Sequence, residues 1–291
     1  MTKTITILLA MVQADAGELF QATPIPVAGF TAGIEGPACD EAGNLYAVAY
    51  QQPENIARIS PDGKAEVFVT LPNKSCGNGI VFDRAGRMYV ADYVNHNVLS
   101  IDPETREVTV FVHEPKMHQP NDLAIADDGT LYASDPDWEN NRGQIWKITP
   151  AGEITLFAAD LGTTNGIEVS TDGKTLYVNE SVQRNIWAFD LTAAAPQKKL
   201  VKRFEDHGLD GMRCDVDGNL YVARFGKGTV AKLSPTGELL DEIDVLGSKP
   251  SNVCLGGPDG RTAYVTEMEK QRLVTFRVDQ PGRAWARQHN R

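Results

Sequence analysis

Hydrophobic and polar residues alternate along most of the chain in short segments, separated by turns rich in Gly, Pro, Asp and Asn. This period-2 alternation is typical of β-strands, and no segment shows the 3.6-residue spacing of an amphipathic helix. Pairs of alternating segments join through a short turn, as in NIARISPDGKAEVFV, NVLSIDPETREVTVFV, QIWKITPAGEITLF and TVAKLSPTGELLDEI. These four segments are predicted to be β-hairpins.

One phrase recurs six times: an acidic or turn residue, then Gly, then a strand that contains a tyrosine. The six tyrosines are Tyr46, Tyr89, Tyr132, Tyr177, Tyr221 and Tyr264. Their spacings of 43, 43, 45, 44 and 43 residues match the period of four-stranded propeller blades. We therefore predict an all-β, six-bladed β-propeller with four antiparallel strands per blade, formed by residues 17–291 as a single domain. Because little chain follows Val278, a strand around Leu19 to Pro24 is expected to complete the last blade.

Six polar residues hold one position in the repeats, 11 or 12 residues before the tyrosine. They are Glu35, Asn78, Asn121, Asn165, Asp210 and Asn252. Blades are related by a pseudo-sixfold axis, so this phase places the side chains at one height, at one mouth of the central channel. A hard cation such as Ca²⁺ takes about 6–8 oxygen ligands of this kind, whereas zinc prefers His and Cys. The pattern predicts one divalent metal ion there, Ca²⁺ in the first place, with Mn²⁺, Fe²⁺ or Zn²⁺ as alternatives.

A simpler interpretation is that these residues only form turns, since Asn-Gly and Asp-Gly pairs suit positive φ. For Asn78 and Asn252 we favour this interpretation, or a secondary role. Turn chemistry does not call for the glutamate at Glu35. Two carboxylates, Glu35 and Asp210, that converge on one axis also repel each other unless a cation lies between them. These two residues are therefore expected to bind the metal.

The composition restricts the classes of partner. The chain has 39 acidic and 28 basic residues, a formal charge of −11, and no cluster of Lys and Arg. Nucleic acid is therefore not expected as a partner, because phosphate backbones need a basic face. No apolar run approaches the ~20 residues of a membrane span. The four cysteines lack the number of a disulfide scaffold and the spacing of a metal site, so we interpret them as small buried apolar residues. The oligomeric state is left open.

The first 16 residues have two interpretations. Met1 to Lys3 gives a weakly positive start, Ile5 to Val12 is apolar, and Ala14-Asp15-Ala16 resembles a signal-peptide cleavage site. In that case the protein is periplasmic or secreted. Alternatively, residues 1–16 form an extra N-terminal strand of a cytoplasmic protein.

Five segments contain the in-phase residues other than Asn78, and they read IEGPACD, PNDLAIADDGTLY, TNGIEVSTDGKTLYVNES, LDGMRCDVDGNLYVARFG and KPSNVCLGGPDGRTAYVTE. These segments resemble the senescence marker protein/gluconolactonase family of six-bladed propellers, and the likeness extends over nearly the whole chain from Gly17. The resemblance implies that Glu35, Asn165 and Asp210 bind a catalytic metal, and that Asn121 is a fourth ligand or a substrate contact. It also implies a hydrolase that opens a small sugar lactone such as gluconolactone, with the metal as Lewis acid and Asp210 as base or nucleophile.

Two residues depart from the fluorophosphatase branch of this family. Arg213 stands where that branch has an acidic residue for a second calcium, and Met268 stands where it has a His. We therefore do not expect a second structural metal of that type. An organophosphate hydrolase is the second hypothesis. The third is a non-enzymatic calcium-binding platform for other proteins, because one fold serves many functions.

Loops around the ring carry further candidates. His118 and His207 could act as acid or base, although we interpret them as solvated loop residues. Trp138 is expected either to line the pocket or to pack at its rim. Asp135 and Arg224, which follow tyrosine strands, are expected to face the substrate.

Overall fold

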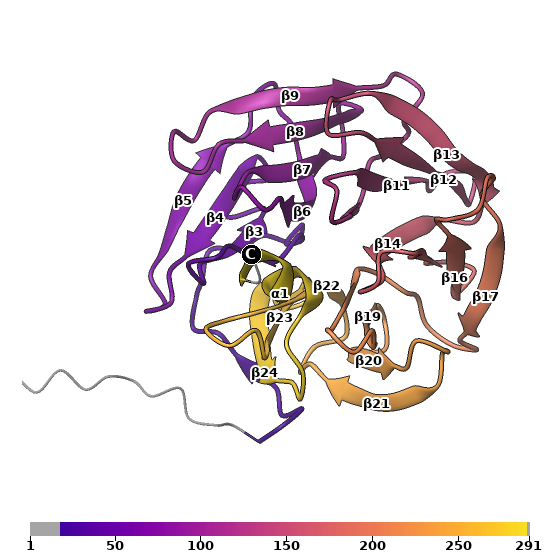
Figure 1. Cartoon of the computed structure of the whole chain (residues 1–291). Coiled ribbons are helices and arrows are strands. Elements are labelled where there is room, and N and C mark those ends of the chain that lie inside the picture. Colours follow the sequence, from indigo (N-terminus) through magenta and orange to yellow (C-terminus); the bar gives the residue numbers. More distant parts are fainter. Residues whose placement is uncertain (1–17, 290–291) are drawn as a thin grey trace, which may run out of the picture.

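The computed structural model describes residues 18–289 and shows six four-stranded antiparallel sheets arranged as a ring around a central channel (Figure 1). Each sheet is one blade. Blades 1 to 5 begin with β2, β6, β10, β14 and β18, and blade 6 combines β22, β23 and β24 with β1. The six-bladed propeller predicted from the repeats is therefore confirmed. The choice between a signal peptide and an extra strand concerns residues 1–16, which lie outside the described residues.

The strands of each blade run in order from the channel to the rim. The inner strands are β2 (Ala38–Cys39), β6 (Gly77–Phe82), β10 (Leu123–Ile125), β14 (Thr164–Val169), β18 (Met212–Cys214) and β22 (Pro250–Gly256). The tyrosine strands are β3 (Leu45–Val48), β7 (Met88–Asp92), β11 (Leu131–Asp137), β15 (Thr175–Glu180), β19 (Leu220–Arg224) and β23 (Thr262–Glu267). The third strands are β4 (Asn55–Ile59), β8 (Asn97–Ile101), β12 (Arg142–Ile148), β16 (Asn185–Asp190), β20 (Thr229–Leu233) and β24 (Arg272–Arg277). The outer strands are β5 (Ala65–Thr70), β9 (Val108–His113), β13 (Ile154–Leu161), β17 (Lys198–Arg203), β21 (Leu239–Asp244) and β1 (Thr23–Pro24). The four predicted hairpins are the antiparallel pairs β4–β5, β8–β9, β12–β13 and β20–β21.

The core is distributed between the blades. Buried apolar residues within the described part of the chain form six clusters, and each cluster lies between two neighbouring blades. The ring of Tyr46 illustrates this arrangement, because it contacts Phe68 of its own blade and Phe82 of the next, with centroids 5.1 and 5.3 Å apart. The repeated tyrosine therefore marks the packing between blades.

The N-terminal strand closes the ring. Thr23 and Pro24 of β1 pair antiparallel with Thr275 and Val274 of β24. The closing strand expected around Leu19 to Pro24 is confirmed, although its regular pairing covers two residues. Because the first described segment completes the last sheet, the ring is joined within the chain and the outer edge of blade 6 is covered.

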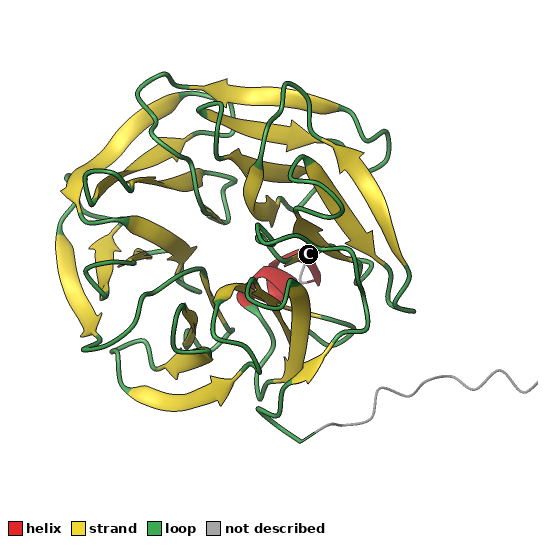
Figure 2. Ribbon diagram, turned by 180° about the vertical axis from the view of Figure 1, so that it is seen from behind, coloured by secondary structure: helices red, strands yellow, loops and turns green. Residues whose placement is uncertain are grey.

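The sequence pattern misses one helix, α1 (Arg283–His289), so the expectation of no helix is wrong at this point. The helix lies near the middle of the ring (Figures 1 and 2). Seven residues are too few to display a helical period. Arg283 and Arg287 are also buried, whereas a sequence pattern treats arginine as surface. No helix among the described residues is long and apolar enough to cross a membrane.

Candidate active site

A cavity of about 710 Å³ opens at the end of the channel where the inner strands begin. Five of the six in-phase residues line it, namely Glu35, Asn78, Asn121, Asn165 and Asp210. The sixth, Asn252, is buried, and its Oδ1 accepts a hydrogen bond from the N–H of Val253 at 2.8 Å. Counting along the repeats thus finds five side chains that share one cavity, and we call these five side chains the ring. The side-chain oxygen of Asn252 is bonded to the adjacent backbone N–H instead.

The side-chain oxygens of Asn78 and Asn165 are buried and have no hydrogen-bond partner among residues 18–289. The Asn165 amide is oriented by its Nδ2, which donates to Ser181 Oγ at 3.0 Å. That hydroxyl in turn donates to the backbone carbonyl of Leu209. A buried oxygen that accepts no hydrogen bond costs free energy, so each of these two atoms is suited to bind a ligand such as a cation. Asn78 therefore shares the feature that marks Asn165, although turn formation was the role expected for it.

The two carboxylates of the ring are destabilised in their charged form. Burial raises the pKa of Glu35 to about 7, an effect that the charge of Asp122 reinforces and the N–H of Gly36, 2.8 Å from Oε2, opposes. Burial and the charge of Glu35 together raise the pKa of Asp210 well above its usual range. Glu35 is buried and Asp210 is partly buried, and two such carboxylates that repel each other are stabilised by a cation placed between them.

Glycines beside the ring allow the inner strands to come close together. A Cβ at Gly36, where φ is +57°, would collide with the backbone carbonyl of Asn78. A Cβ at Gly211 would collide with the side chain of Asn252. The glycine that follows a ring residue therefore permits the close approach that gathers the ring around the channel axis.

The donor set of the ring fits a hard divalent cation. Two carboxylates and three amide oxygens approach the ~6–8 oxygen ligands that Ca²⁺ takes. Among residues 18–289, no group of three or more His, Cys, Asp or Glu side chains gathers as a metal site, so a typical structural zinc site does not match.

The backbone of Asp210 is held at the cavity by a side chain of the neighbouring blade. Asn179 Nδ2 donates to the backbone carbonyl of Asp210 at 2.5 Å.

A buried ion pair lies in the channel beside the ring. Arg213 of β18 grips Asp122, which precedes β10, through two contacts of 2.7 and 2.8 Å. Asp122 is fully buried and Arg213 is 6% exposed. The guanidinium therefore supplies the positive charge that the buried carboxylate requires. The expectation that this chain lacks a second structural metal stays a prediction.

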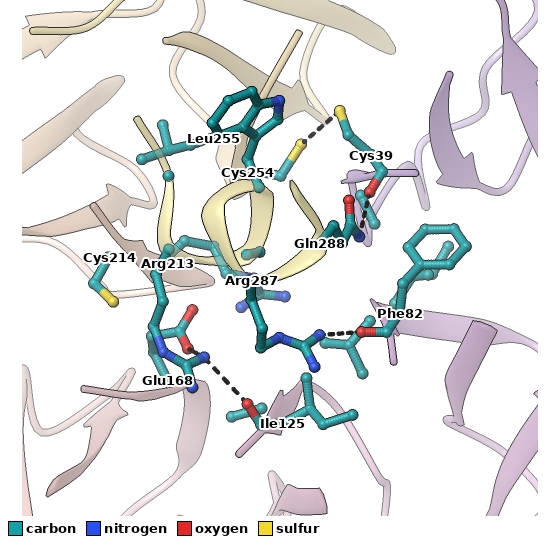
Figure 3. A pocket seen from close by; sticks show the side chains of 18 of the residues that line it. Cys39, Phe82, Ile125, Glu168, Arg213, Cys214, Cys254, Leu255, Arg287 and Gln288 are labelled. Atoms are coloured by element: carbon teal, nitrogen blue, oxygen red, sulfur yellow. Dashed lines mark hydrogen bonds and ion pairs between the residues drawn. The ribbon is translucent and has the colours of Figure 1, made fainter. Parts of the chain in front are cut away.

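Helix α1 covers the opposite end of the channel, next to a cavity of about 40 Å³ (Figure 3). Arg287 donates to the backbone carbonyl of Phe82, the last residue of β6. Arg283 donates to the carbonyl of Ile125, the last residue of β10, at 3.1 Å, and lies 3.4 Å from Glu168. The helix thus joins the ends of several inner strands, and the ring faces the other mouth.

Asp135 is not among the residues that line the large cavity. Its carboxylate is fully buried and accepts hydrogen bonds from the backbone N–H groups of His118 and Gln119, at 2.8 and 2.7 Å. It also accepts from Trp146 Nε1 at 2.9 Å. The structure therefore gives Asp135 an anchoring position below the loop that leads to Asn121, and does not bring it to the site.

Arg224 is also absent from the cavity wall. Its side chain is 1% exposed, pairs with Asp206 at 2.8 Å and Glu242 at 3.3 Å, and stacks on the ring of Phe204. Arg224 and Asp135 both stand three residues after a repeat tyrosine. Other charged residues at this phase also bond to loops or neighbouring side chains, and they are Asp92, Glu180 and Glu267. The repeat phase could thus have indicated an anchoring role for both residues.

The rest of the cavity wall is largely apolar. Besides the ring, the lining side chains include Cys76, Tyr93, Trp138, Val182, Arg184, His207, Leu209, Phe225 and Met268. Trp138 and His207 therefore lie at the site, and His118 does not. The interpretation of the cysteines as buried residues holds for Cys214 and Cys254, whereas Cys39 and Cys76 are partly exposed.

Arg184 stands seven residues after Tyr177, and His96 and Gln271, which also have positive φ, stand at the same distance after their repeat tyrosines. This phase indicates a turn and does not indicate a binding side chain.

The fold and the ring define the class: a six-bladed β-propeller that gathers carboxylate and amide oxygens at one mouth of its channel. The family model described as SMP-30/Gluconolactonase/LRE-like region matches residues 34–269, and the chain belongs to this family. The matched region contains every in-phase residue from Glu35 to Asn252.

The proteins similar in sequence to this chain include enzymes of two kinds. The gluconolactonase of Zymomonas mobilis is 29% identical over 270 residues, which cover 80% of this chain and 75% of that protein. The diisopropyl-fluorophosphatase of Loligo vulgaris is 27% identical over 285 residues, covering 86% and 90%. A solved structure of a calcium-binding protein, regucalcin, from Agrobacterium tumefaciens has a TM-score of 0.75 at 21% identity, covering 92% of this chain and 95% of that one. The last likeness shows the fold.

Proposed function

We propose that this protein is a metal-dependent lactonase that hydrolyses an aldonolactone, a cyclic ester of a sugar acid. It is a hydrolase of a carboxylic ester bond. The observation that carries the proposal is the ring, in which a buried carboxylate (Glu35), a partly buried one (Asp210) and amide oxygens without a partner among the described residues share one open cavity. The likeness to a gluconolactonase over most of both chains supports the same reaction.

Four residues would hold the metal, namely Glu35, Asn121, Asn165 and Asp210, and the free oxygen of Asn78 adds a fifth donor. With about five protein oxygens, an ion that takes ~6–8 ligands keeps positions for water and substrate. When bound, the ion supplies Lewis acidity to the ester carbonyl. Ca²⁺ fits the oxygen-only ring best, in keeping with the calcium-binding protein of the same fold.

Asp210 performs the proton transfers. In the metal-free protein, burial and the charge of Glu35 raise the pKa of Asp210 well above its usual range, and a bound cation would lower it again. The carboxylate lies at the cavity, where it can accept a proton from water. It accepts a proton from water as the water oxygen bonds to the carbonyl carbon. The ester bond to the ring oxygen then breaks, and that oxygen takes the proton from Asp210, which yields the open hydroxy acid. A variant in which the Asp210 oxygen attacks the carbonyl carbon first, and water then releases the acyl group, uses the same residue.

The test is the hydrolysis of D-glucono-δ-lactone, followed with a pH indicator, by protein that is stripped with a chelator and resupplied with Ca²⁺, Mn²⁺, Fe²⁺ or Zn²⁺ in turn. We expect no turnover in the stripped protein and recovery with at least one ion, Ca²⁺ first. If no ion restores hydrolysis of this lactone or of the acidic D-glucaro-1,4-lactone, the lactonase proposal is wrong. Turnover of an organophosphorus ester in its place would support the second hypothesis.

The stability of the protein should depend on pH and metal together. The folded, metal-free protein holds Glu35 with a pKa of about 7, above the ordinary 4.5, so folding takes up protons between these values. The contribution of Glu35 to stability is therefore fully present below about pH 4.5 and is lost as the pH rises through about 7. A bound cation needs the deprotonated form, so it should stabilise the protein more at pH 8 than at pH 5.5.

Thermal unfolding with and without Ca²⁺ at both pH values measures this effect. The substitution Glu35→Gln should raise the unfolding temperature of the stripped protein at pH 8 by several degrees and weaken its response to Ca²⁺. Glu238→Gln, which changes an exposed glutamate, serves as the control and should leave both quantities unchanged. An equal response to Ca²⁺ in wild type and Glu35→Gln would argue against Glu35 as a ligand.

A further inference from the structure

The wall of the cavity contains one arginine, Arg184, whose backbone is held firmly. It stands in the turn between β15 and β16 with φ of 62°, in the left-handed region. Its N–H donates to the carbonyl of Glu180 at 2.7 Å, and its carbonyl accepts from the N–H of Phe204 at 3.0 Å. The turn therefore presents the Arg184 side chain to the cavity from a fixed position.

The guanidinium of Arg184 lacks an acidic partner. Its Nη1 donates to the backbone carbonyl of Glu205 at 2.7 Å, and its Nε is buried without any partner. Within residues 18–289, no carboxylate oxygen lies within the 4.0 Å ion-pair limit of this side chain. By contrast, the imidazole of His207, which also lines the cavity, has Asp206 at 3.1 Å.

A shortage of acidic residues does not explain why Arg184 has no carboxylate partner, because the chain has 39 acidic and 28 basic residues. The buried Arg213 and Arg224 both have carboxylates within 3.3 Å. Arg272 and Arg287, like Arg184, donate to a backbone carbonyl and have an unpartnered Nε among the described residues. Neither of them lines the large cavity, so the position in the cavity wall is what distinguishes Arg184.

A guanidinium that retains free N–H groups in a cavity is suited to a planar anion, to which it can donate two parallel hydrogen bonds. The apolar neighbours in the same wall, such as Leu209 and Phe225, would strengthen such an ion pair by excluding water.

We propose that Arg184 is a specificity-determining residue that binds an anionic substituent of the substrate. This inference rests on the proposed lactonase function and narrows its substrate class. The substrate is an acidic sugar lactone, in which a carboxylate or a comparable anionic group contacts Arg184 while the ester carbonyl lies at the ring. A neutral lactone would leave the guanidinium desolvated and unpaired, which costs affinity.

Binding and turnover test the inference separately. Affinity for the open-chain acids D-glucarate and D-gluconate, which differ by one terminal carboxylate, is measured on the Ca²⁺-loaded protein by calorimetry. We expect wild type to bind glucarate about 10- to 100-fold more tightly, the range of a hydrogen bond to a charged group. Arg184→Met should remove most of this preference and leave gluconate affinity within about threefold. Arg184→Lys, which keeps the charge and loses the planar geometry, should retain part of it.

Lys249→Met is the matched control, because Lys249 is an exposed cation near Phe225 but is not part of the cavity wall. It should preserve the preference for glucarate. The inference is overturned if wild type does not distinguish the two acids, or if Arg184→Met weakens both equally in a protein whose circular dichroism is unchanged. Hydrolysis of D-glucaro-1,4-lactone and D-glucono-1,4-lactone is measured in parallel. Turnover of neither lactone, with the glucarate preference intact, refutes the lactonase function and leaves the anion site standing.

Discussion

Asp210→Asn is expected to lower kcat for lactone hydrolysis by roughly 10²- to 10⁴-fold, the range that a general base contributes. The amide has the same shape but cannot accept a proton from water. The fold should be retained, because the contact that fixes this residue runs from Asn179 to the backbone carbonyl of Asp210 and does not involve its carboxylate. Initial rates at saturating lactone and saturating metal, with a circular dichroism spectrum of each variant, make the measurement.

The choice of control separates catalysis from general electrostatics. Asp217→Asn removes a carboxylate from the exposed turn between β18 and β19 of the same blade and should leave kcat unchanged. Metal content must be measured in both variants, because Asp210 is also a proposed ligand. A metal-loaded Asp210→Asn protein with wild-type kcat would remove Asp210 from the mechanism. Loss of activity together with loss of bound metal would support its ligand role alone.

The repeats explain why so much of the site was accessible from the sequence. A propeller places equivalent residues of each blade at one height, so a count from Tyr46 or Tyr221 is also a statement about three-dimensional position. This reasoning found Glu35 and Asp210, which line one cavity although 175 residues separate them in the chain. Phase alone did not reveal which amide oxygens remain unpartnered. That depends on neighbours such as Ser181, which orients the amide of Asn165.

Charged residues after the tyrosine strands were harder to interpret. The sequence predicts that Asp135 and Arg224 face the substrate, but both are buried and form hydrogen bonds or ion pairs with neighbouring residues. The same difficulty applies to Arg283 and Arg287 of α1, which reach backbone carbonyls at the ends of the inner strands. A hydrophobic pattern cannot anticipate polar side chains whose partners are backbone groups or distant residues, because it records polarity and not pairing.

The two ends of the channel carry charges of opposite sign. At the ring end, neither Glu35 nor Asp210 has a basic partner within the described part of the chain, and the charge of Asp122 raises the pKa of both still further. At the opposite end, helix α1 places the arginines Arg283 and Arg287. Arg213 lies between these regions and forms an ion pair with Asp122. It therefore limits the excess of negative charge behind the ring, where a fully buried carboxylate would otherwise stand alone.

Arg213→Met is expected to destabilise the folded protein by about 3–5 kcal/mol, the cost of leaving one partner of a buried ion pair uncompensated. Urea unfolding, with the free energy taken from the midpoint and slope, measures the loss. The double substitution Arg213→Met with Asp122→Leu removes both charges and should recover much of it, since an apolar pair carries no desolvation penalty. As a control, Arg142→Met breaks a pair with Asp137 in which the arginine side chain is 63% exposed, and should cost less than about 1 kcal/mol. Equal losses in Arg213→Met and in the double variant would show that packing, and not the unpaired charge of Asp122, is what Arg213 supplies.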